Sequence, residues 1–220
     1  MNTQYRMHPA IAMYPSAAFY DGQLGAGINA SDRPPPRGFN WPSRDFPVAF
    51  CNVTGTEQKH GNSYANLAQT SIIENVLLDL LRAGDLRQND IGIISPYSCQ
   101  VSHVRQRLRK GGKFYFPLVE VASVDGFQGR EKELIILSTT RANERGDLGF
   151  VKDLRRMNVA LTRARRGIIV VGHGETLARD ATGWGPWLRW FRQTSSAISP
   201  HAVQVSAHLR WQRRAEKRKS

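Results

Sequence analysis

Apolar residues in this chain recur with two different periods, and the two kinds of stretch alternate along it. Short apolar runs predict five strands, at residues 48–53, 91–95, 119–124, 134–138 and 168–171. Residues 66–82 carry apolar side chains at helical spacing, and Gly84 is placed to end that helix. A second helical segment is expected over residues 100–109. The alternation predicts a mainly parallel α/β sheet with helices on both faces, a RecA-like or Rossmann-like layered domain.

Residues 153–172 combine a basic helical segment with the last apolar strand. One predicted helix face is apolar and is formed by Leu154, Met157, Leu161 and Ala164. Arg156 and Arg163 are seven residues apart and are predicted to share the opposite face, beside the sheet. Planar guanidinium groups in such a place suit the binding of phosphoryl oxygens. A solvated helix face is the alternative interpretation.

The segments outside this alternation are less regular. At the start of the chain Pro9 and Pro15 interrupt apolar and aromatic residues, so short helical turns are expected there in place of one long helix. Residues 21–47 are rich in glycine and proline and predict a surface excursion with little regular structure. Residues 55–64 predict a polar loop. Tryptophans after residue 183 predict a closing helix whose aromatic side chains pack on the sheet.

Composition narrows the class of protein. A chain of 220 residues with 40% hydrophobic content fits one globular domain. The net charge of +13 favours a polyanionic partner, with nucleic acid ahead of an acidic membrane surface. Cys51 and Cys99 are expected to be free thiols in a reducing compartment. No apolar run approaches the roughly 20 residues of a membrane span, so a soluble, intracellular protein is expected.

Several residues are candidates for binding chemistry. Tyr5 could stack on a base while Arg6 reaches phosphates, although a packed aromatic beside a surface cation is the alternative. Ser95 and Tyr97 follow a predicted strand at its carboxyl end, where parallel sheets collect ligands, so we expect the hydroxyl and the ring to contact nucleic acid. A plain turn before a helix is the alternative. Glu131 projects from a glycine-containing turn and could accept hydrogen bonds from ribose, unless it is only a solvated carboxylate.

Four segments together resemble one protein family. They are QYRMHP at residues 4–9, SPY at 95–97, VASVDGFQGREKELIILS at 121–138 and RRMNVALTRARRGIIVVG at 155–172. Their order and approximate spacing are similar to those in the second RecA-like motor domain of superfamily 1B helicases, in the group that contains the nonsense-mediated decay helicase and senataxin. The resemblance covers about residues 2–193. We therefore expect a motor domain over residues 1–193, with the excursion at 21–47, and a basic, flexible tail over 194–220 that is either solvating or available to phosphates.

The resemblance implies a role for particular residues. Tyr5 matches an aromatic that stacks on adenine, Glu131 a carboxylate that contacts ribose, and Arg6 and Arg163 two arginines that reach the γ-phosphate of ATP. Two segments match nucleic-acid contacts, which are Ser95, Pro96 and Tyr97, and Ser123, Val124 and Asp125. One position departs from the family, which usually has Glu where this chain has Gln69.

The resemblance also implies a partner domain. An ATP-driven, 5′-to-3′ helicase needs a phosphate-binding loop and acidic residues for Mg²⁺, but the sequence contains neither G-x-x-x-x-G-K-[ST] nor an Asp-Glu pair. We therefore expect a first RecA-like motor domain to hold Mg²⁺ and most of the ATP, and the isolated chain to be inactive as an ATPase. Single-stranded RNA or DNA is the other expected partner, no membrane is expected, and the location is expected to be cytoplasmic or nuclear.

Two other functions compete with this prediction. The first is a non-catalytic module that binds nucleic acid with the same fold and basic surface. The second is a stand-alone nucleotide enzyme of the Rossmann type, which is disfavoured because no G-x-G-x-x-G follows any predicted strand.

Overall fold

A computed structural model of the protein describes residues 3–111 and 114–198. Its strands are β1 Thr3–Gln4, β2 Gly25–Ala26, β3 Val48–Asn52, β4 Gln58–His60, β5 Ser63–Ala65, β6 Ile91–Ile94, β7 Glu120–Ala122, β8 Lys132–Ser138 and β9 Ala164–Gly172. Its α-helices are α1 Pro9–Phe19, α2 Leu67–Arg82, α3 Ser98–Gln106, α4 Leu154–Leu161, α5 Gly174–Ala178 and α6 Trp184–Ile198.

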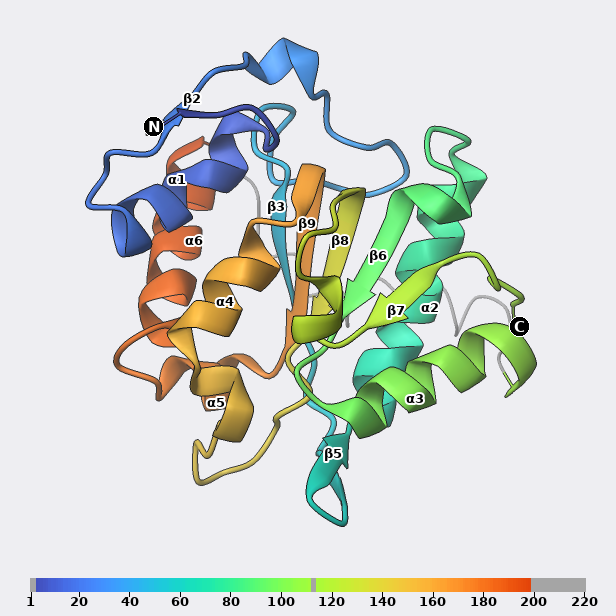
Figure 1. Cartoon of the computed structure of the whole chain (residues 1–220). Helices are drawn as coiled ribbons and strands as arrows, with labels where there is room; N and C mark the ends of the chain where they lie inside the picture. Colours follow the sequence, from blue (N-terminus) through green and yellow to red (C-terminus); the bar gives the residue numbers. More distant parts are fainter. Residues whose placement is uncertain (1–2, 112–113, 199–220) are drawn as a thin grey trace.

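The central sheet contains five strands in the order β3-β9-β8-β6-β7, and all of the pairings are parallel. Figure 1 shows α1, α4, α5 and α6 on one side of this sheet and α2 and α3 on the other. Alternate strand residues serve the two sides, because side chains on a strand point to opposite faces. On β8, Ile135 packs in the α1-side cluster and Ile136 in the α2-side cluster. The predicted α/β, RecA-like layered arrangement with a parallel sheet is confirmed.

All five predicted strands of the sheet are present, and the amphipathic helix α2 begins after its N-cap Asn66, as its pattern predicted. Gly84 follows α2 with φ +69°, a backbone conformation that glycine adopts at little cost. The closing helix α6 buries Trp184 and Trp187 as core residues. Residues 194–198 continue α6, and the rest of the predicted tail, 199–220, lies outside the described residues.

Three local predictions are wrong. The opening segment forms a single helix, α1, which begins at Pro9 and continues through Pro15. His8 caps it by accepting a hydrogen bond from the backbone of Ala10, and Tyr14 anchors it through a hydrogen bond to Gly183. Burial of this helix against the sheet offsets the hydrogen bond that the Pro15 nitrogen cannot donate.

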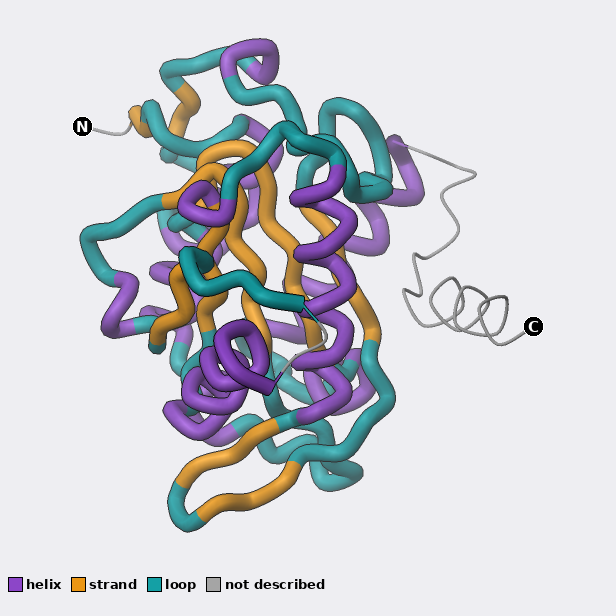
Figure 2. Tube along the Cα trace, turned by 90° about the vertical axis from the view of Figure 1, so that its right-hand side faces the viewer, coloured by secondary structure: helices purple, strands orange, loops and turns teal. Residues whose placement is uncertain are grey.

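The second wrong prediction concerns residues 55–64, where β4 and β5 form an antiparallel hairpin. It is the two-stranded loop at the bottom of Figure 2. The third concerns the basic helix, because α4 ends at Leu161 and β9 already begins at Ala164. Arg163 therefore lies in the connection between them and does not share a helix face with Arg156. The backbone of Lys132 pairs with Arg163, which explains the early start of β9.

No helix in the described part of the chain is both long enough and apolar enough to cross a membrane.

Candidate functional site

The candidate residues divide between the two edges of the parallel sheet. Glu131 and Arg163 immediately precede β8 and β9, so they lie at the edge where the strands begin, called here the amino edge. Ser95 and Ser123 follow β6 and β7, at the opposite carboxyl edge. The seven residues of β8 separate the two edges by about 20 Å at the usual rise per residue. The two sets of predicted contacts are thus distinct sites.

At the amino edge three predicted residues from distant parts of the sequence meet. Arg6 forms an ion pair with Glu131, and its guanidinium also donates to the backbone oxygen of Thr162 at 3.2 Å. Arg163 donates to the side-chain oxygen of Thr162 at 3.1 Å and to the backbone oxygen of Val159 at 3.0 Å. Both guanidinium groups are therefore fixed on the same turn, the last one of α4. The cluster of Arg6, Glu131 and Arg163 is called here the arginine cluster.

Electrostatics in the arginine cluster reflect the close approach of like charges. Burial, followed by the nearby charge of Arg6, lowers the pKa of Arg163. The hydrogen bond from Arg6 lowers the pKa of Glu131, and the charges of Arg6, Arg165 and Arg163 add to this effect. Arg6 and Arg163 hold two positive charges close together, and Glu131 pairs with Arg6. The two guanidinium groups together favour the approach of an anion such as a phosphate.

Tyr5 lies next to this cluster in the sequence and remains available for stacking. Its side chain is 66% exposed. The ring lies against Gly27, where an added Cβ would come within 2.3 Å of a ring atom. Strands β1 and β2 pair in parallel and hold this arrangement together. A side chain at position 27 would push the ring away, so Gly27 is part of what positions Tyr5.

Sequence reasoning missed one cation at the amino edge. Arg165 lies on β9 and approaches Glu131 at 3.8 Å and Glu133 at 3.3 Å. Its backbone oxygen accepts a hydrogen bond from the backbone of His8, which ties the start of α1 to the sheet. The strand begins Ala164-Arg165-Arg166-Gly167, without an alternation of charged and apolar residues, so the sequence carried no signal for its early start.

At the carboxyl edge, the structure buries two of the predicted nucleic-acid contacts. Ser95 is 1% exposed and hydrogen-bonds the side chain of Thr140 at 2.9 Å. Tyr97 is 2% exposed, and its hydroxyl donates to the backbone of Leu148 at 3.0 Å. The expected contacts of the Ser95 hydroxyl and the Tyr97 ring with nucleic acid do not fit this burial, because both groups are used in packing. Pro96 between them remains partly exposed.

The second predicted segment, Ser123–Asp125, is only partly accessible. The Ser123 hydroxyl accepts a hydrogen bond from the backbone of Gly126 at 3.1 Å, and Val124 is buried. Asp125 is exposed and binds Arg156 with both carboxylate oxygens, at 3.3 and 2.9 Å. This pairing keeps Arg156 at the carboxyl edge, and the hydrogen bond that Arg156 donates to Asp125 raises the pKa of Arg156. The predicted contacts of this segment with nucleic acid remain a prediction.

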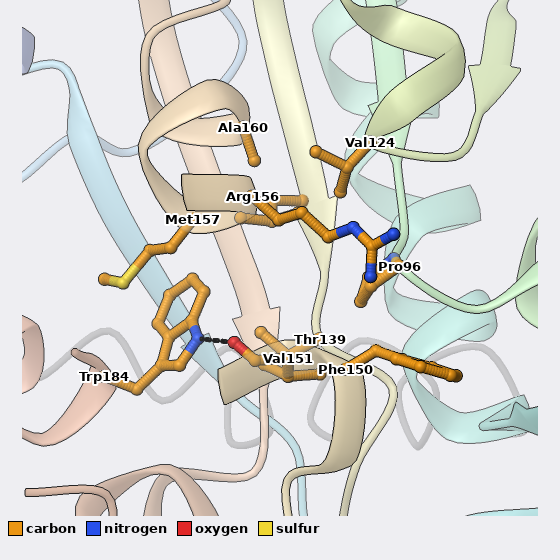
Figure 3. A pocket seen from close by; sticks show the side chains of 10 residues that line it. Pro96, Val124, Thr139, Phe150, Val151, Arg156, Met157, Ala160 and Trp184 are labelled. Atoms are coloured by element: carbon orange, nitrogen blue, oxygen red, sulfur yellow. Dashed lines mark hydrogen bonds between the residues drawn. The ribbon is translucent and has the colours of Figure 1, made fainter. Parts of the chain in front are cut away.

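Phe150, an aromatic that the sequence did not single out, stands beside these residues. It is 55% exposed, and the Arg156 guanidinium lies 5.7 Å from the centre of its ring. Figure 3 shows Phe150, Arg156, Pro96 and Val124 around a shallow cleft. The cleft encloses about 20 Å³, enough for about one water molecule and far too little for a base.

A buried arginine, Arg141, holds the loop that carries Phe150. Arg141 is 3% exposed, and its Nε donates to both carboxylate oxygens of Glu57 at 3.0 Å. Its other nitrogens donate to the Tyr97 hydroxyl at 3.1 Å and to Asp147 at 2.9 Å. Burial disfavours the charge, but the hydrogen bonds with these three partners raise the pKa of Arg141 above its ordinary value. The groups Arg141, Glu57, Tyr97 and Asp147 are called here the Arg141 network.

The amide at position 69 belongs to the same edge. Gln69 is fully buried, and its Oε1 accepts hydrogen bonds from the Ser138 hydroxyl at 2.8 Å and the Thr140 backbone at 2.9 Å. It therefore fixes the backbone at the end of β8, just before Arg141. Gln69, which stands where the family usually has Glu, therefore has a structural role in this protein.

Within the described residues, no group of three or more His, Cys, Asp and Glu side chains could hold a metal ion.

Comparisons with known proteins agree with the sequence motifs. Residues 1–175 match the model of a family described as an AAA domain. Regulator of nonsense transcripts 1 from Dictyostelium discoideum is 41% identical over 203 residues, which are 90% of this chain and 15% of that protein. The ATP-dependent helicase NAM7 from Saccharomyces cerevisiae is 40% identical over 204 residues, 90% of this chain and 21% of that protein. The chain thus spans about a fifth or less of these relatives' lengths.

Among solved structures, the C-terminal domain of a possible DNA helicase from Lactobacillus plantarum superposes with a TM-score of 0.44 and 15% identity. The superposition covers 80% of this chain and 94% of that one.

Proposed function

This chain belongs to the AAA-domain family and is similar over most of its length to regulators of nonsense transcripts, and from that premise we propose that it is the second motor domain of an ATP-dependent helicase. In this proposal it completes an ATP site with arginines and grips single-stranded RNA or DNA while the motor moves 5′ to 3′. The observation that carries the proposal is the arginine cluster, because folding brings Arg6, Glu131 and Arg163 together from three distant segments.

Each residue at the amino edge then has a chemical task. Tyr5 stacks on the adenine ring, and Glu131 accepts hydrogen bonds from the ribose hydroxyls. Arg6 and Arg163 neutralise charge that develops on the transferred phosphoryl group, an effect worth about 10³–10⁵ in rate for arginine fingers in general. A first motor domain holds the phosphates and Mg²⁺, which supplies further charge neutralisation at the phosphoryl oxygens. These residues all lie at the amino edge of the sheet, which is consistent with an ATP site shared between two domains.

The ion pair between Arg6 and Glu131 must open when these residues bind ATP. The side chains are 34% and 41% exposed, so the pair is screened by solvent and stabilises the fold by at most about 1 kcal/mol. Opening this pair therefore costs little, and the ion pair holds Arg6 in position until ATP arrives.

The test joins this chain to a complete first motor domain from one of its relatives. Arg163→Ala should lower ATP hydrolysis by about 10³-fold or more while nucleotide still binds, because the arginine acts on charge in the transition state. Arg82→Ala, which removes an exposed arginine at the end of α2, is the matched control and should leave hydrolysis unchanged. Hydrolysis by Arg163→Ala within about threefold of the parent protein would refute the proposed role.

The same fusion protein distinguishes the proposed motor domain from the competing function, a non-catalytic module that binds nucleic acid. If the parent fusion binds single strands but shows no nucleic-acid-stimulated hydrolysis, the module is the better description. The 220-residue chain alone should release no phosphate from ATP above background in either case. Phosphoryl transfer depends on positioning and electrostatics. In this proposal the phosphate-binding loop and the acidic residues for Mg²⁺ are supplied by the first motor domain.

A further inference from the structure

Phe150 is a large aromatic side chain left open at the carboxyl edge, and its position is fixed by its surroundings. Exposed aromatics at the ends of loops are often mobile, but here the Arg141 network holds the preceding residues. The Tyr97 hydroxyl donates to the backbone of Leu148, and Asp147 binds Arg141. Asn143 closes the same loop with two hydrogen bonds to the backbone of Asp147, at 2.8 and 2.9 Å. The ring therefore projects from a rigid base.

Gly149 shows how closely this loop is packed. It has φ +50°, and an added Cβ would lie 2.6 Å from the Tyr97 hydroxyl and 2.7 Å from an Arg141 nitrogen. The loop passes directly over the Arg141 network and then turns Phe150 outward. A buried guanidinium is costly unless all of its partners are in place. The network therefore defines a single position for the loop, which preorganises the ring.

Cationic and acidic side chains both lie near Phe150. The Arg156 guanidinium lies over the ring, 5.7 Å from its centre, and Lys152 and Arg155 are exposed within five residues of it. Asp125 pairs with Arg156 and Asp147 with Arg141, while the exposed Asp153 caps the start of α4. An aromatic platform flanked by cations is the arrangement that binds single strands, because bases stack on the ring and phosphates follow the cations. The cleft behind the ring is too small for a base, so a base can only stack on the exposed surface.

We propose that Phe150 is a stacking platform for one base of the single strand, with Arg156 beside it and the Arg141 network as the device that positions it. This site rests on the proposed function, because the single strand is the ligand in both. It adds a contact that depends on the base itself and not on the backbone charge. A surface that only attracted phosphates would bind strands with and without bases equally well.

The experiment uses two labelled strands of equal length, an oligouridine of about 12 nucleotides and an abasic strand with the same backbone. The whole chain should bind the oligouridine more tightly than the abasic strand in fluorescence anisotropy. Phe150→Ala should weaken binding to oligouridine about five- to tenfold, within the range expected for the loss of one stacked base, and leave abasic binding within about twofold. Phe150→Trp should restore binding and Phe150→Leu should not, since only the former keeps an aromatic face.

Tyr115→Ala is the matched control, because it removes another aromatic side chain, 68% exposed, from a loop between α3 and β7. It should leave both affinities unchanged. If the parent chain binds neither strand, the nucleic-acid part of the proposed function fails and this site fails with it. If the parent binds but Phe150→Ala has no effect, or weakens both strands equally, or Phe150→Leu behaves like the parent, only the stacking site is overturned.

Discussion

Replacement of Arg141 by methionine should destabilise the protein far more than any change of a surface arginine. Methionine keeps much of the side-chain volume but removes the charge, so Glu57, which is only 11% exposed, loses the guanidinium whose Nε donates to both of its carboxylate oxygens. Removal of one partner from a buried ion pair costs about 3–5 kcal/mol. Glu57 retains hydrogen bonds from the backbone of Ala142 at 2.5 Å and from Asn143 at 3.1 Å, which places the loss near the lower end.

The other partners of Arg141 change this estimate little. Asp147 is 61% exposed, so water replaces the lost ion pair. Loss of the Arg141–Asp147 ion pair therefore contributes less than about 1 kcal/mol to the destabilisation. Tyr97 keeps its hydrogen bond to Leu148. We therefore expect Arg141→Met to lower the free energy of unfolding by about 3–4 kcal/mol. That would be a large fraction of the stability of an ordinary domain.

Urea unfolding followed by tryptophan fluorescence is the assay, since Trp184 and Trp187 are buried in the core. The double variant Arg141→Met with Glu57→Gln should recover about 1–2 kcal/mol relative to the sum of the two single changes, because it removes the uncompensated carboxylate. Arg155→Met, at an exposed arginine, is the control and should change the stability by less than about 0.5 kcal/mol. A loss of under 1 kcal/mol for Arg141→Met, or strict additivity in the double variant, would refute the network's role.

Three further predictions concern the exposed charges and the thiols. Asp125→Asn should tighten single-strand binding about two- to fivefold and steepen its salt dependence, because it frees Arg156 for phosphates; unchanged affinity in a salt titration would count against Arg156 as a contact. Glu131→Gln should lower stability by at most about 1 kcal/mol at pH 7. Because the folded-state pKa of Glu131 lies below its unfolded value, this contribution is present above about pH 4.5 and is lost as the pH falls through the folded-state pKa. A difference in stability between variant and parent that does not shrink as the pH is lowered from about 4.5 would contradict it. Burial raises the pKa of the Cys51 thiol to about 12, so a thiol reagent at pH 8 should modify only Cys99 until the protein unfolds.

The sequence alone was sufficient for the architecture. Apolar runs such as those of β6, β8 and β9 predict strands buried on both faces, because these runs lack the alternation of a half-exposed strand. Helices between them require parallel pairing, which the structure shows. The family motifs likewise identified Arg6, Glu131 and Arg163, and the structure brings these three side chains together. Their roles toward ATP remain a prediction.

Boundaries and burial were decided only by tertiary contacts. The helix that carries Arg156 ends at Leu161, since the backbone at Arg163 pairs with β8, and no periodicity along the chain reveals a partner 31 residues away. α1 passes through Pro15, because packing against the sheet outweighs one missing hydrogen bond.

At the carboxyl edge, tertiary contacts also decide which side chains are accessible. Tyr97 follows a strand end, where the sequence favoured a ligand contact, but Arg141 and Leu148 draw its hydroxyl into the interior. Phe150 carried no signal in the sequence, because its exposure depends on a loop fixed by Glu57 and Asp147 through Arg141. Motifs record which residues a site uses, whereas the accessibility of each one depends on long-range contacts that form only in the folded protein.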